Sequence, residues 1–412
     1  MSNRFSSVAT LILLALLASR QARADGPEKP IFSFSGFGTV GAAHSSEKKA
    51  DFVTNGFKPN GAGRSRSWSA AVDSVIAGQV TATPTPQLSA ILQVVSEQNY
   101  DNSYTPHVEW ANLKYQITPD FDIRVGRTVL PIFLLSDTRK VAYTYAWVRP
   151  PLELYQLVPV THSDGIDASY RLRFGDVTNT LQLDWGKGDN KIPNGGGEAR
   201  TRAAVTASNT IEYGALTARL SYGRANLNLN SFDALFGGFR QFGPEGIALA
   251  DKYDASNKSL SFIGIGASYD PGEWFGNVEW GHLDSDSAIG KRTVWYASGG
   301  YRVGPFTPYL TYARATANNL SDPGLTIASL PPQLAGPAAG LNAGLNSVLR
   351  AKPVQSTVSV GARWDVMKNT ALKLQFDRTR ISEGSNGTVT NIQPGFQPSR
   401  LNVISATVDF IF

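Results

Sequence analysis

The stretch IDASYRLRF, residues 166–174, decides the fold class of this chain. Along it, apolar residues (Ile, Ala, Tyr, Leu, Phe) alternate strictly with polar ones (Asp, Ser, Arg, Arg). Successive side chains of a β-strand point to opposite faces of a sheet, so a period of two sends every apolar residue to one face. The stretch therefore predicts a strand that lies between an apolar and a polar medium.

The same alternation recurs along the whole chain. Sixteen segments show it, at residues 31–44, 67–83, 87–99, 107–117, 121–130, 164–174, 177–187, 200–213, 215–227, 258–269, 274–283, 291–302, 305–315, 354–366, 370–381 and 400–412. Seven connections between them are tight, and eight longer ones centre near residues 55, 103, 147, 194, 242, 287, 335 and 390. Short turns at one end and long loops at the other are typical of a transmembrane β-barrel. The pattern favours sixteen strands and leaves eighteen as the alternative.

The length of these segments argues against a soluble β-sandwich. Strands of soluble sheets average about five or six residues, whereas about ten are needed for a tilted strand to cross a bilayer. Aromatic residues beside the tight turns suggest an interfacial girdle; they are Tyr115, Phe121, Phe174, Tyr213, Tyr269, Trp274, Tyr301, Phe306 and Trp364. We predict an all-β, antiparallel transmembrane barrel in which residues 400–412 pair with residues 31–44, because lipid offers no partner to a free sheet edge.

Residues 1–24 have the features of a secretory signal peptide. Arg4 precedes an apolar run from Val8 to Ala18, and Ala22-Arg23-Ala24 is a small-x-small cleavage site. We expect cleavage near Ala24 and one barrel domain over residues 25–412. Loss of the three arginines of this segment lowers the formal net charge from +5 to about +2, which does not favour nucleic-acid binding. The chain has no Cys, which excludes disulfides and cysteine-bound metals.

The polar faces of the predicted strands should line a water-filled lumen. The candidate pore-lining cations are Arg124, Arg171, Arg173, Arg202, Arg219, Arg363 and Lys373. The candidate acids are Asp73, Asp122, Asp167, Asp184 and Asp377. Such charges either form a constriction that selects solutes or simply pair across strands in a hydrated wall.

Arg127 does not fit the alternation, since it shares parity with Val125 and Val129, which would face lipid. It must lie above the bilayer, or a bulge must change the face of the strand at that point.

The connection over residues 131–163 is long and rich in Pro, apolar and aromatic residues. Loops of this length are usually functional or disordered, and disordered loops are poor in such residues. We therefore predict that this third long loop folds into the lumen, where its charged residues would narrow the pore. Those constriction candidates are Asp137, Arg139, Lys140, Arg149 and Glu153. The alternatives are a cap over the mouth and a contact between subunits.

Signals of enzyme chemistry are thin. His162-Ser163-Asp164 contains the residue types of a catalytic triad, but adjacency in sequence does not bring side chains into hydrogen-bond reach. The four His residues lack ligand spacing, and Asp284-Ser285-Asp286 is more simply a solvated loop tip than a calcium site. We expect no catalytic activity, no metal and no cofactor.

The C-terminal strand, which ends on Phe412, resembles the assembly signal of outer-membrane barrels, a terminal aromatic residue that the insertion machinery recognises. With its sixteen segments and long third loop, the mature chain resembles the general Gram-negative porin family. The first strand, FSGFGTVG at residues 34–41, is similar to the porin start. The stretch from Val125-Gly126-Arg127 through RPPLELY at residues 149–155 to Asp164-Gly165 resembles a group of proteobacterial porin-like proteins.

This resemblance implies a place in the outer membrane among its lipids, and passive diffusion of small hydrophilic solutes. It also implies a homotrimer, although the Pro-Glu-Phe-Gly-Gly turn in the third loop of the best-known trimeric porins is missing here. A substrate-selective channel is the alternative function, and solute-saturable conductance would distinguish it. An outer-membrane barrel enzyme is a third possibility, which the absence of a spaced Ser/His pair argues against.

Overall fold

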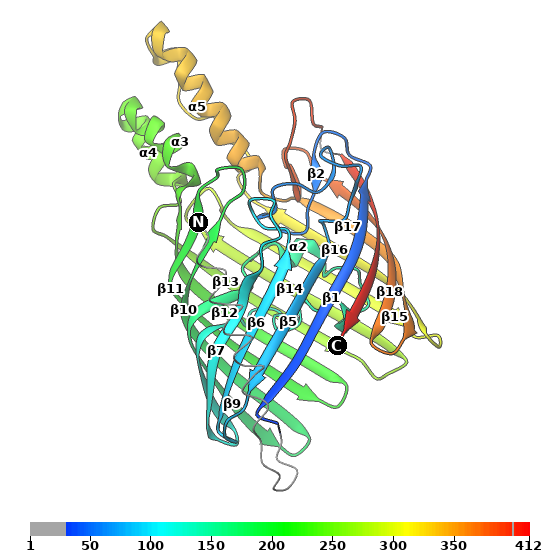
Figure 1. Cartoon of the computed structure of the whole chain (residues 1–412). Helices are drawn as coiled ribbons and strands as arrows, with labels where there is room; N and C mark the ends of the chain where they lie inside the picture. The colour runs from blue at the N-terminus through cyan, green and yellow to red at the C-terminus, as the bar shows by residue number, and fades with distance from the viewer. Residues whose placement is uncertain (1–29, 398) are drawn as a thin grey trace, which may run out of the picture.

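The computed structural model describes residues 30–397 and 399–412. The predicted signal peptide and its cleavage site lie outside these residues. Within the described chain, sixteen antiparallel strands form a closed barrel (Figure 1). They are β1 (Phe32–Ser45), β5 (Val75–Ala82), β6 (Leu88–Glu97), β7 (His107–Thr118), β8 (Phe121–Val129), β9 (His162–Phe174), β10 (Val177–Lys191), β11 (Glu198–Tyr213), β12 (Leu216–Leu229), β13 (Lys258–Tyr269), β14 (Trp274–Ser285), β15 (Arg292–Tyr301), β16 (Phe306–Ala317), β17 (Gln355–Met367), β18 (Thr370–Ile381) and β20 (Arg400–Ile411).

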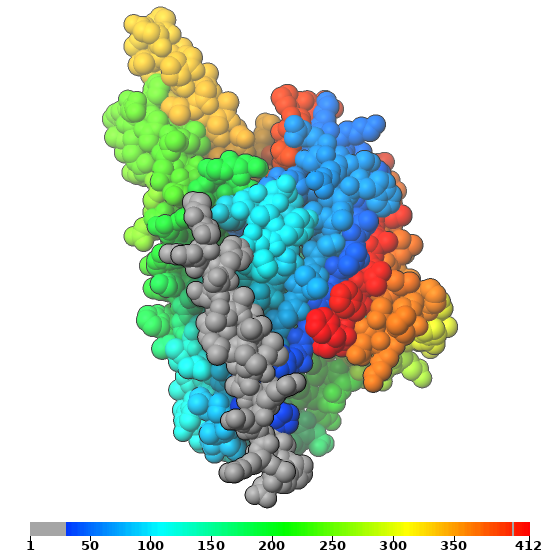
Figure 2. All heavy atoms as spheres, in the orientation of Figure 1, coloured from blue at the N-terminus to red at the C-terminus, as the bar shows by residue number. Residues whose placement is uncertain are grey.

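The barrel closes where β1 and β20 pair, from Phe37 opposite Ile411 to Ser45 opposite Val403. Figure 2 shows the C-terminal strand lying directly beside the N-terminal one. The predicted fold class, the count of sixteen strands and the pairing of the two ends of the chain are therefore confirmed. One predicted strand, residues 67–83, is shorter than expected, because residues 70–74 turn and leave only β4 (Trp68–Ser69) beside β1 before β5 begins.

The two faces of the sheet differ as the alternation predicted. On β9 and β10, Ile166, Leu183 and Trp185 are 44%, 53% and 57% exposed, whereas Asp167 and Asp184 are fully buried. Because the sheet is closed, the exposed apolar face is the outer one and the polar face is the inner one. An apolar outer surface and a polar interior are what a barrel in lipid requires.

The long loops carry regular structure that the alternation of the strands could not indicate. Small strands β2 (Asp51–Phe52), β3 (Ala62–Gly63) and β19 (Val389–Thr390) form a separate sheet. The α-helices are α2 (Leu152–Tyr155), α3 (Asp233–Phe239), α4 (Gly243–Tyr253) and α5 (Pro332–Arg350), and the 3-10 helices are η1 (Ala142–Thr144), η2 (Asn230–Phe232), η3 (Arg240–Phe242) and η4 (Ile327–Ser329). Within the described residues, no helix is both long and apolar enough to cross a membrane.

Helices α3, α4 and α5 stand together beyond one end of the barrel (Figure 1). They share an apolar cluster that includes Phe236, Phe239, Tyr253, Leu345 and Leu349. These helices therefore form a packed lobe on the side of the long loops.

Phe412 completes the closure of the barrel at the other end of the seam. Its backbone N–H donates to the carbonyl oxygen of Gly36 (3.0 Å), and the N–H of Gly36 donates to the carbonyl oxygen of Phe412 (2.8 Å). The ring of Phe412 is 66% exposed, so it adds little to the core.

We expect deletion of Phe412 to impair insertion into the membrane much more than it alters the folded barrel, because the exposed terminal ring is available to an insertion factor. The amount of protein in the outer membrane and its heat-modifiable migration on gels would measure the two effects. Phe412→Tyr, which keeps a terminal aromatic ring, should insert nearly normally. Normal insertion of the truncated chain would rule out an assembly role for this residue.

Candidate functional site

The inner wall of the barrel has two unlike halves. On β14–β18 and β20 the inward polar side chains are buried, among them Glu279, Thr311, Lys373, Gln375 and Ser405. On β7–β12 several inward polar side chains keep contact with solvent, among them Lys114, Asp122, Arg171, Thr180 and Glu212. The connection between β8 and β9 covers the first half, as the contacts below show.

Arg149 fixes the middle of this connection to three strands or strand ends. Its guanidinium donates from Nε and Nη2 to the carboxylate of Asp73 (2.8 and 2.7 Å) and from Nη1 to Asp377 (2.9 Å). Nη2 also donates to the hydroxyl of Ser405 (2.5 Å). Arg149 is 6% exposed, so this cluster is shielded from water, where charge-assisted hydrogen bonds are strong.

A second group of contacts fixes the residues just before Arg149. Lys373 on β18 donates from Nζ to the carbonyl oxygens of Ala142 (2.6 Å) and Trp147 (2.7 Å), and it pairs with Asp409 on β20 (2.9 Å). The indole N–H of Trp147 donates to Ser298 on β15 (2.8 Å). The wall thus supplies polar partners for groups that the connection would otherwise bury unpaired.

Two buried carboxylates hold further parts of the connection, on both sides of Arg149. Glu153 accepts hydrogen bonds from Gln355 (2.7 Å) and from the hydroxyl of Thr357 on β17. Burial raises the pKa of Glu153, although these two hydrogen bonds act in the opposite direction. Glu279 on β14 accepts from the hydroxyl of Tyr155 (2.7 Å) and from the backbone N–H of Leu134 (2.8 Å).

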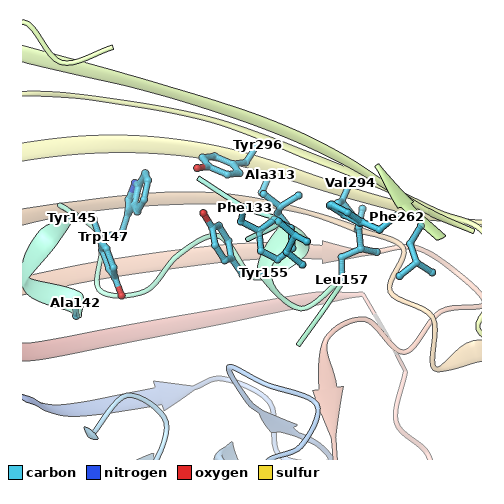
Figure 3. Close-up of a cluster of buried hydrophobic side chains, with 14 of the residues drawn as sticks. Phe133, Ala142, Tyr145, Trp147, Tyr155, Leu157, Phe262, Val294, Tyr296 and Ala313 are labelled. Carbon is cyan, nitrogen blue, oxygen red and sulfur yellow. The ribbon is translucent and has the colours of Figure 1, made fainter. Parts of the chain in front are cut away.

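An apolar cluster fills the space between the connection and this wall. In Figure 3, Phe133, Trp147, Tyr155 and Leu157 of the connection lie against wall residues that include Tyr296. Burial of such large side chains contributes about 1.5–3 kcal/mol each, so the connection is an integral part of the barrel core.

The other edge of the connection meets a mixed cluster of charges. Lys140 lies between Glu97 on β6 and Glu109 on β7, with its Nζ atom 3.1 Å from a carboxylate oxygen of Glu109. Burial lowers the pKa of Lys140, but the two carboxylates outweigh burial and raise it overall. Beside this cluster lies a cavity of about 590 Å³ whose lining carries charges of both signs, among them Lys58 and Asp73.

The sequence model of the family described as "Gram-negative porin" matches residues 162–384, which is more than half of the chain. The chain belongs to the Gram-negative porin family. The resemblance of the sequence to porins is therefore confirmed, and the protein is a channel of the Gram-negative outer membrane. No curated protein matches the sequence of this porin.

Solved structures agree with this assignment at the level of the fold. The chain is similar to OmpF of Salmonella typhi, solved in complex with daunomycin, with a TM-score of 0.56, 11% identity and coverage of 92% of this chain and 97% of that one. It is also similar to the outer membrane channel DcaP of Acinetobacter baumannii (TM-score 0.56, 12% identity, coverage 95% and 100%). A third similar structure is an anion-selective porin from Comamonas acidovorans (TM-score 0.54, 13% identity, coverage 92% and 99%).

The predicted wall residues of the porin are mostly paired. On the inner face, Arg124 pairs with Asp167 (2.7 Å) and Asp122 pairs with Lys114 (3.0 Å). Asp184 is buried, with its carboxylate 3.4 Å from the hydroxyl of Thr128.

In the part of the chain that the structure describes, three other inward arginines are not paired with a carboxylate of a neighbouring strand. Arg171 makes no ion pair within the described residues. Arg219 donates to Thr210 (2.9 Å) and to the carbonyl oxygen of Phe133, and Arg363 donates to the carbonyl oxygens of Tyr143 and Tyr145.

The remaining constriction candidates, Asp137 and Arg139, differ in their exposure and in their polar contacts. Asp137 stays more than half exposed, 3.9 Å from Arg219. Arg139 donates to the carbonyl oxygens of Val158 (3.2 Å) and Tyr155, and burial lowers its pKa. Asp137 is therefore a largely hydrated charge in loose contact with Arg219, and Arg139 holds two parts of the connection together.

The prediction that Arg202 lines the lumen is wrong. The pairing of β11 with β12 shifts by one residue between Arg202 and Val205, so a bulge moves Arg202 to the outer face, where it pairs with Asp189 (2.8 Å). The signal in the sequence was the adjacent Ala203-Ala204, which interrupts the alternation. Arg173 also needs correction, since it pairs with Asp120 in the turn before β8 and therefore lies at the rim of the barrel.

Arg127 lies on the outer face, one step beyond Val125. It is directly opposite Asp164 in the sheet and pairs with it (Nε to Oδ1, 2.6 Å). No register shift occurs between β8 and β9, so Arg127 belongs to a charged band beyond the apolar surface.

Ser163 and Asp164, two of the three triad-like residues, lie on opposite faces of β9. The carboxylate of Asp164 pairs on the outer face, whereas Ser163 is buried on the inner one. Asp284 pairs with Lys291 (2.7 Å). Among residues 30–397 and 399–412, no group of three or more His, Asp or Glu side chains is arranged to hold a metal ion.

Proposed function

We propose that small hydrophilic solutes and ions diffuse passively through the half of the lumen that the connection between β8 and β9 leaves free. The observation that carries this proposal is the contrast between the two halves of the inner wall. Most inward polar side chains of β14–β18 are buried beneath the connection, whereas several of those on β7–β12, among them Lys114, Arg171 and Glu212, keep contact with solvent. A polar, hydrated wall beside a narrowing loop sorts solutes by size and charge, and needs no chemical step.

The pathway should prefer anions weakly. Most inward charges are neutralised by a partner, as in the pairs of Arg124 with Asp167 and of Lys114 with Asp122. Arg171 makes no such pair and Arg219 lies 3.9 Å from its nearest carboxylate, while Glu212 at the turn side opposes them. Screening limits the preference further, since the Debye length is about 10 Å at 0.1 M salt.

We expect Arg171→Glu to shift the reversal potential toward cations in single-channel recordings with a salt gradient, and the shift should grow as salt is diluted. Arg200→Glu is the matched control, because Arg200 lies on the outer face near Asp189 (3.9 Å) and makes the same change of charge outside the lumen. A cation-selective wild type, or equal selectivity of both variants, would show that the current does not pass Arg171. Absence of any channel would overturn the proposed function itself.

The proposal includes secretion with cleavage near Ala24, recognition of Phe412 by the insertion machinery, and assembly as a homotrimer. Support for the trimer comes from the general porins that the chain resembles. No catalytic step is part of the proposal. The side chains best placed to contact a solute are the inward charged residues described above, and they line the lumen along its wall.

A further inference from the structure

A second cavity, of about 420 Å³, lies on the loop side of the barrel. One wall is apolar and comes from strands β12–β14 and the segment after β14, with Leu227, Leu260, Phe262, Leu283 and Ile289. Residues near the ends of the connection, including Val158, form the facing side. An apolar wall is unusual where a porin is expected to be hydrated, and the volume suits a small organic molecule.

The charges around this cavity are all of one sign. Among the residues that the structure describes, no carboxylate lines it. The neighbouring cavity of about 590 Å³ differs in this respect, because Asp73, Glu97 and Glu109 contribute to its lining. A cation would therefore find no counter-charge in the apolar cavity.

Arg292 supplies positive charge at the edge of the apolar wall. It begins β15 and shares the inner face with the buried Val294 and Tyr296, whereas Trp295 is on the outer face. Its Nη2 atom donates to the carbonyl oxygen of Leu157 (3.3 Å), while its Nε atom is shielded from solvent and has no partner within the described chain. Nor does any described carboxylate lie within ion-pair distance of this guanidinium. A shielded charge without a counter-ion is costly, so this site favours an anion.

Two neighbouring side chains bear on the charge at Arg292, and Lys352 is the one that adds to it. Glu153 lines a small void together with Arg292, but its carboxylate is already hydrogen-bonded to Gln355 and Thr357. Lys352, in the loop before β17, donates to the carbonyl oxygen of Asn319 (2.6 Å). Burial lowers the pKa of Lys352 to about 8, and the nearby positive charge of Arg292 acts in the same direction. The local field is therefore positive.

We propose that this cavity binds a small amphipathic carboxylate, with its apolar body on the wall of Leu227, Leu260 and Phe262 and its carboxylate on Arg292. The inference rests on the proposed function and gives the channel a preferred class of solute. A sugar would leave its hydroxyls facing leucine, and an organic cation would face Arg292. A simpler role of Arg292, tethering the connection through Leu157, predicts no such preference.

Four probes that differ in one feature each would test the site in the full-length protein. Phenylacetate carries both the apolar body and the charge, 2-phenylethanol lacks the charge, phenethylamine reverses it, and acetate lacks the body. Each would be added to the loop side of single channels in planar bilayers and titrated calorimetrically into the detergent-solubilised protein. We expect phenylacetate to reduce the current saturably and to bind about tenfold more tightly than the other three, because it alone gains both a charge-assisted hydrogen bond and apolar burial.

Variants would then assign the two halves of the site. Arg292→Gln keeps a polar side chain but has no charge, so it should weaken phenylacetate binding about tenfold or more. Arg292→Lys should stay within about threefold of the wild type, Leu260→Asn should weaken binding, and Arg200→Gln should not change it. Equal binding of phenylacetate and 2-phenylethanol, or unchanged binding in Arg292→Gln, would overturn the site.

The two proposals fail in different ways. If the protein conducts KCl but binds no phenylacetate, the proposed porin function stands and the proposed binding site is wrong. If the protein does not conduct, the proposed porin function is wrong, and the calorimetric titration alone then tests whether the site binds phenylacetate.

Discussion

Deletion of residues 134–160 is expected to raise the single-channel conductance on the order of twofold, because this segment covers about half of the inner wall. Strand closure should survive the deletion. The ends of the connection already meet, since the N–H of Leu130 donates to the carbonyl oxygen of Thr161 (3.1 Å) and a short Gly-Ser linker can join them. Asp73 and Asp377 would lose Arg149 but would gain water in the widened lumen, so they would not remain buried and unpaired.

A matched deletion separates this effect from the loss of loop mass in general. Residues 233–253, which form α3, η3 and α4, stand beyond the barrel (Figure 1) and pack against α5. Their removal should leave the conductance almost unchanged. Unaltered conductance after deletion of residues 134–160, in a protein that still shows heat-modifiable migration, would place that segment outside the permeation pathway.

The strands could be predicted because lipid imposes a strict pattern on them. Segments 258–269 and 370–381 coincide with β13 and β18 to the residue. Each outward position must be apolar, so the period of two persists through every crossing. The prediction failed for Arg202, since one extra residue at a bulge exchanges the two faces beyond it.

Helix α5 escaped prediction for a different reason. It contains Pro337 and several Gly residues, which are poor helix formers, and it depends on tertiary contacts. A side chain at Gly344, for example, would meet Leu235 of α3 at 2.8 Å, so the two helices pack closely. Local sequence carries no signal of such packing.

The partners of the constriction residues were also beyond sequence analysis. Arg149 stands out in the sequence as a charged residue in an apolar loop, but the carboxylates that pair with it lie 76 and 228 positions away. Only the closure of the barrel brings Asp73 and Asp377 to the same point. Alternation predicts which face a residue occupies, and it does not predict its height along the wall relative to a distant strand.

Arg149→Met is expected to lower the free energy of unfolding by about 3–5 kcal/mol, because it leaves two buried carboxylates without a counter-charge. Urea titration of the protein in lipid vesicles would measure the loss. Single-channel currents should also become noisier, as the connection detaches from the wall. Arg139→Met is the matched control, since Arg139 is a half-buried arginine of the same connection that donates to carbonyl oxygens. It should lose only about 1–3 kcal/mol.

A triple variant identifies the cause of that loss. If the unpaired charge of Asp73 and Asp377 is responsible, Arg149→Met combined with Asp73→Asn and Asp377→Asn should recover at least half of the lost stability, because amides carry no charge to be buried. If lost packing of the long Arg149 side chain is responsible, the two added substitutions should give no recovery, since they restore no contact with Met at position 149. A triple variant no more stable than Arg149→Met alone would thus show that the ion cluster is incidental to the seating of the connection. Recovery, together with quieter currents, would show that charge neutralisation at this one point holds the connection against the wall.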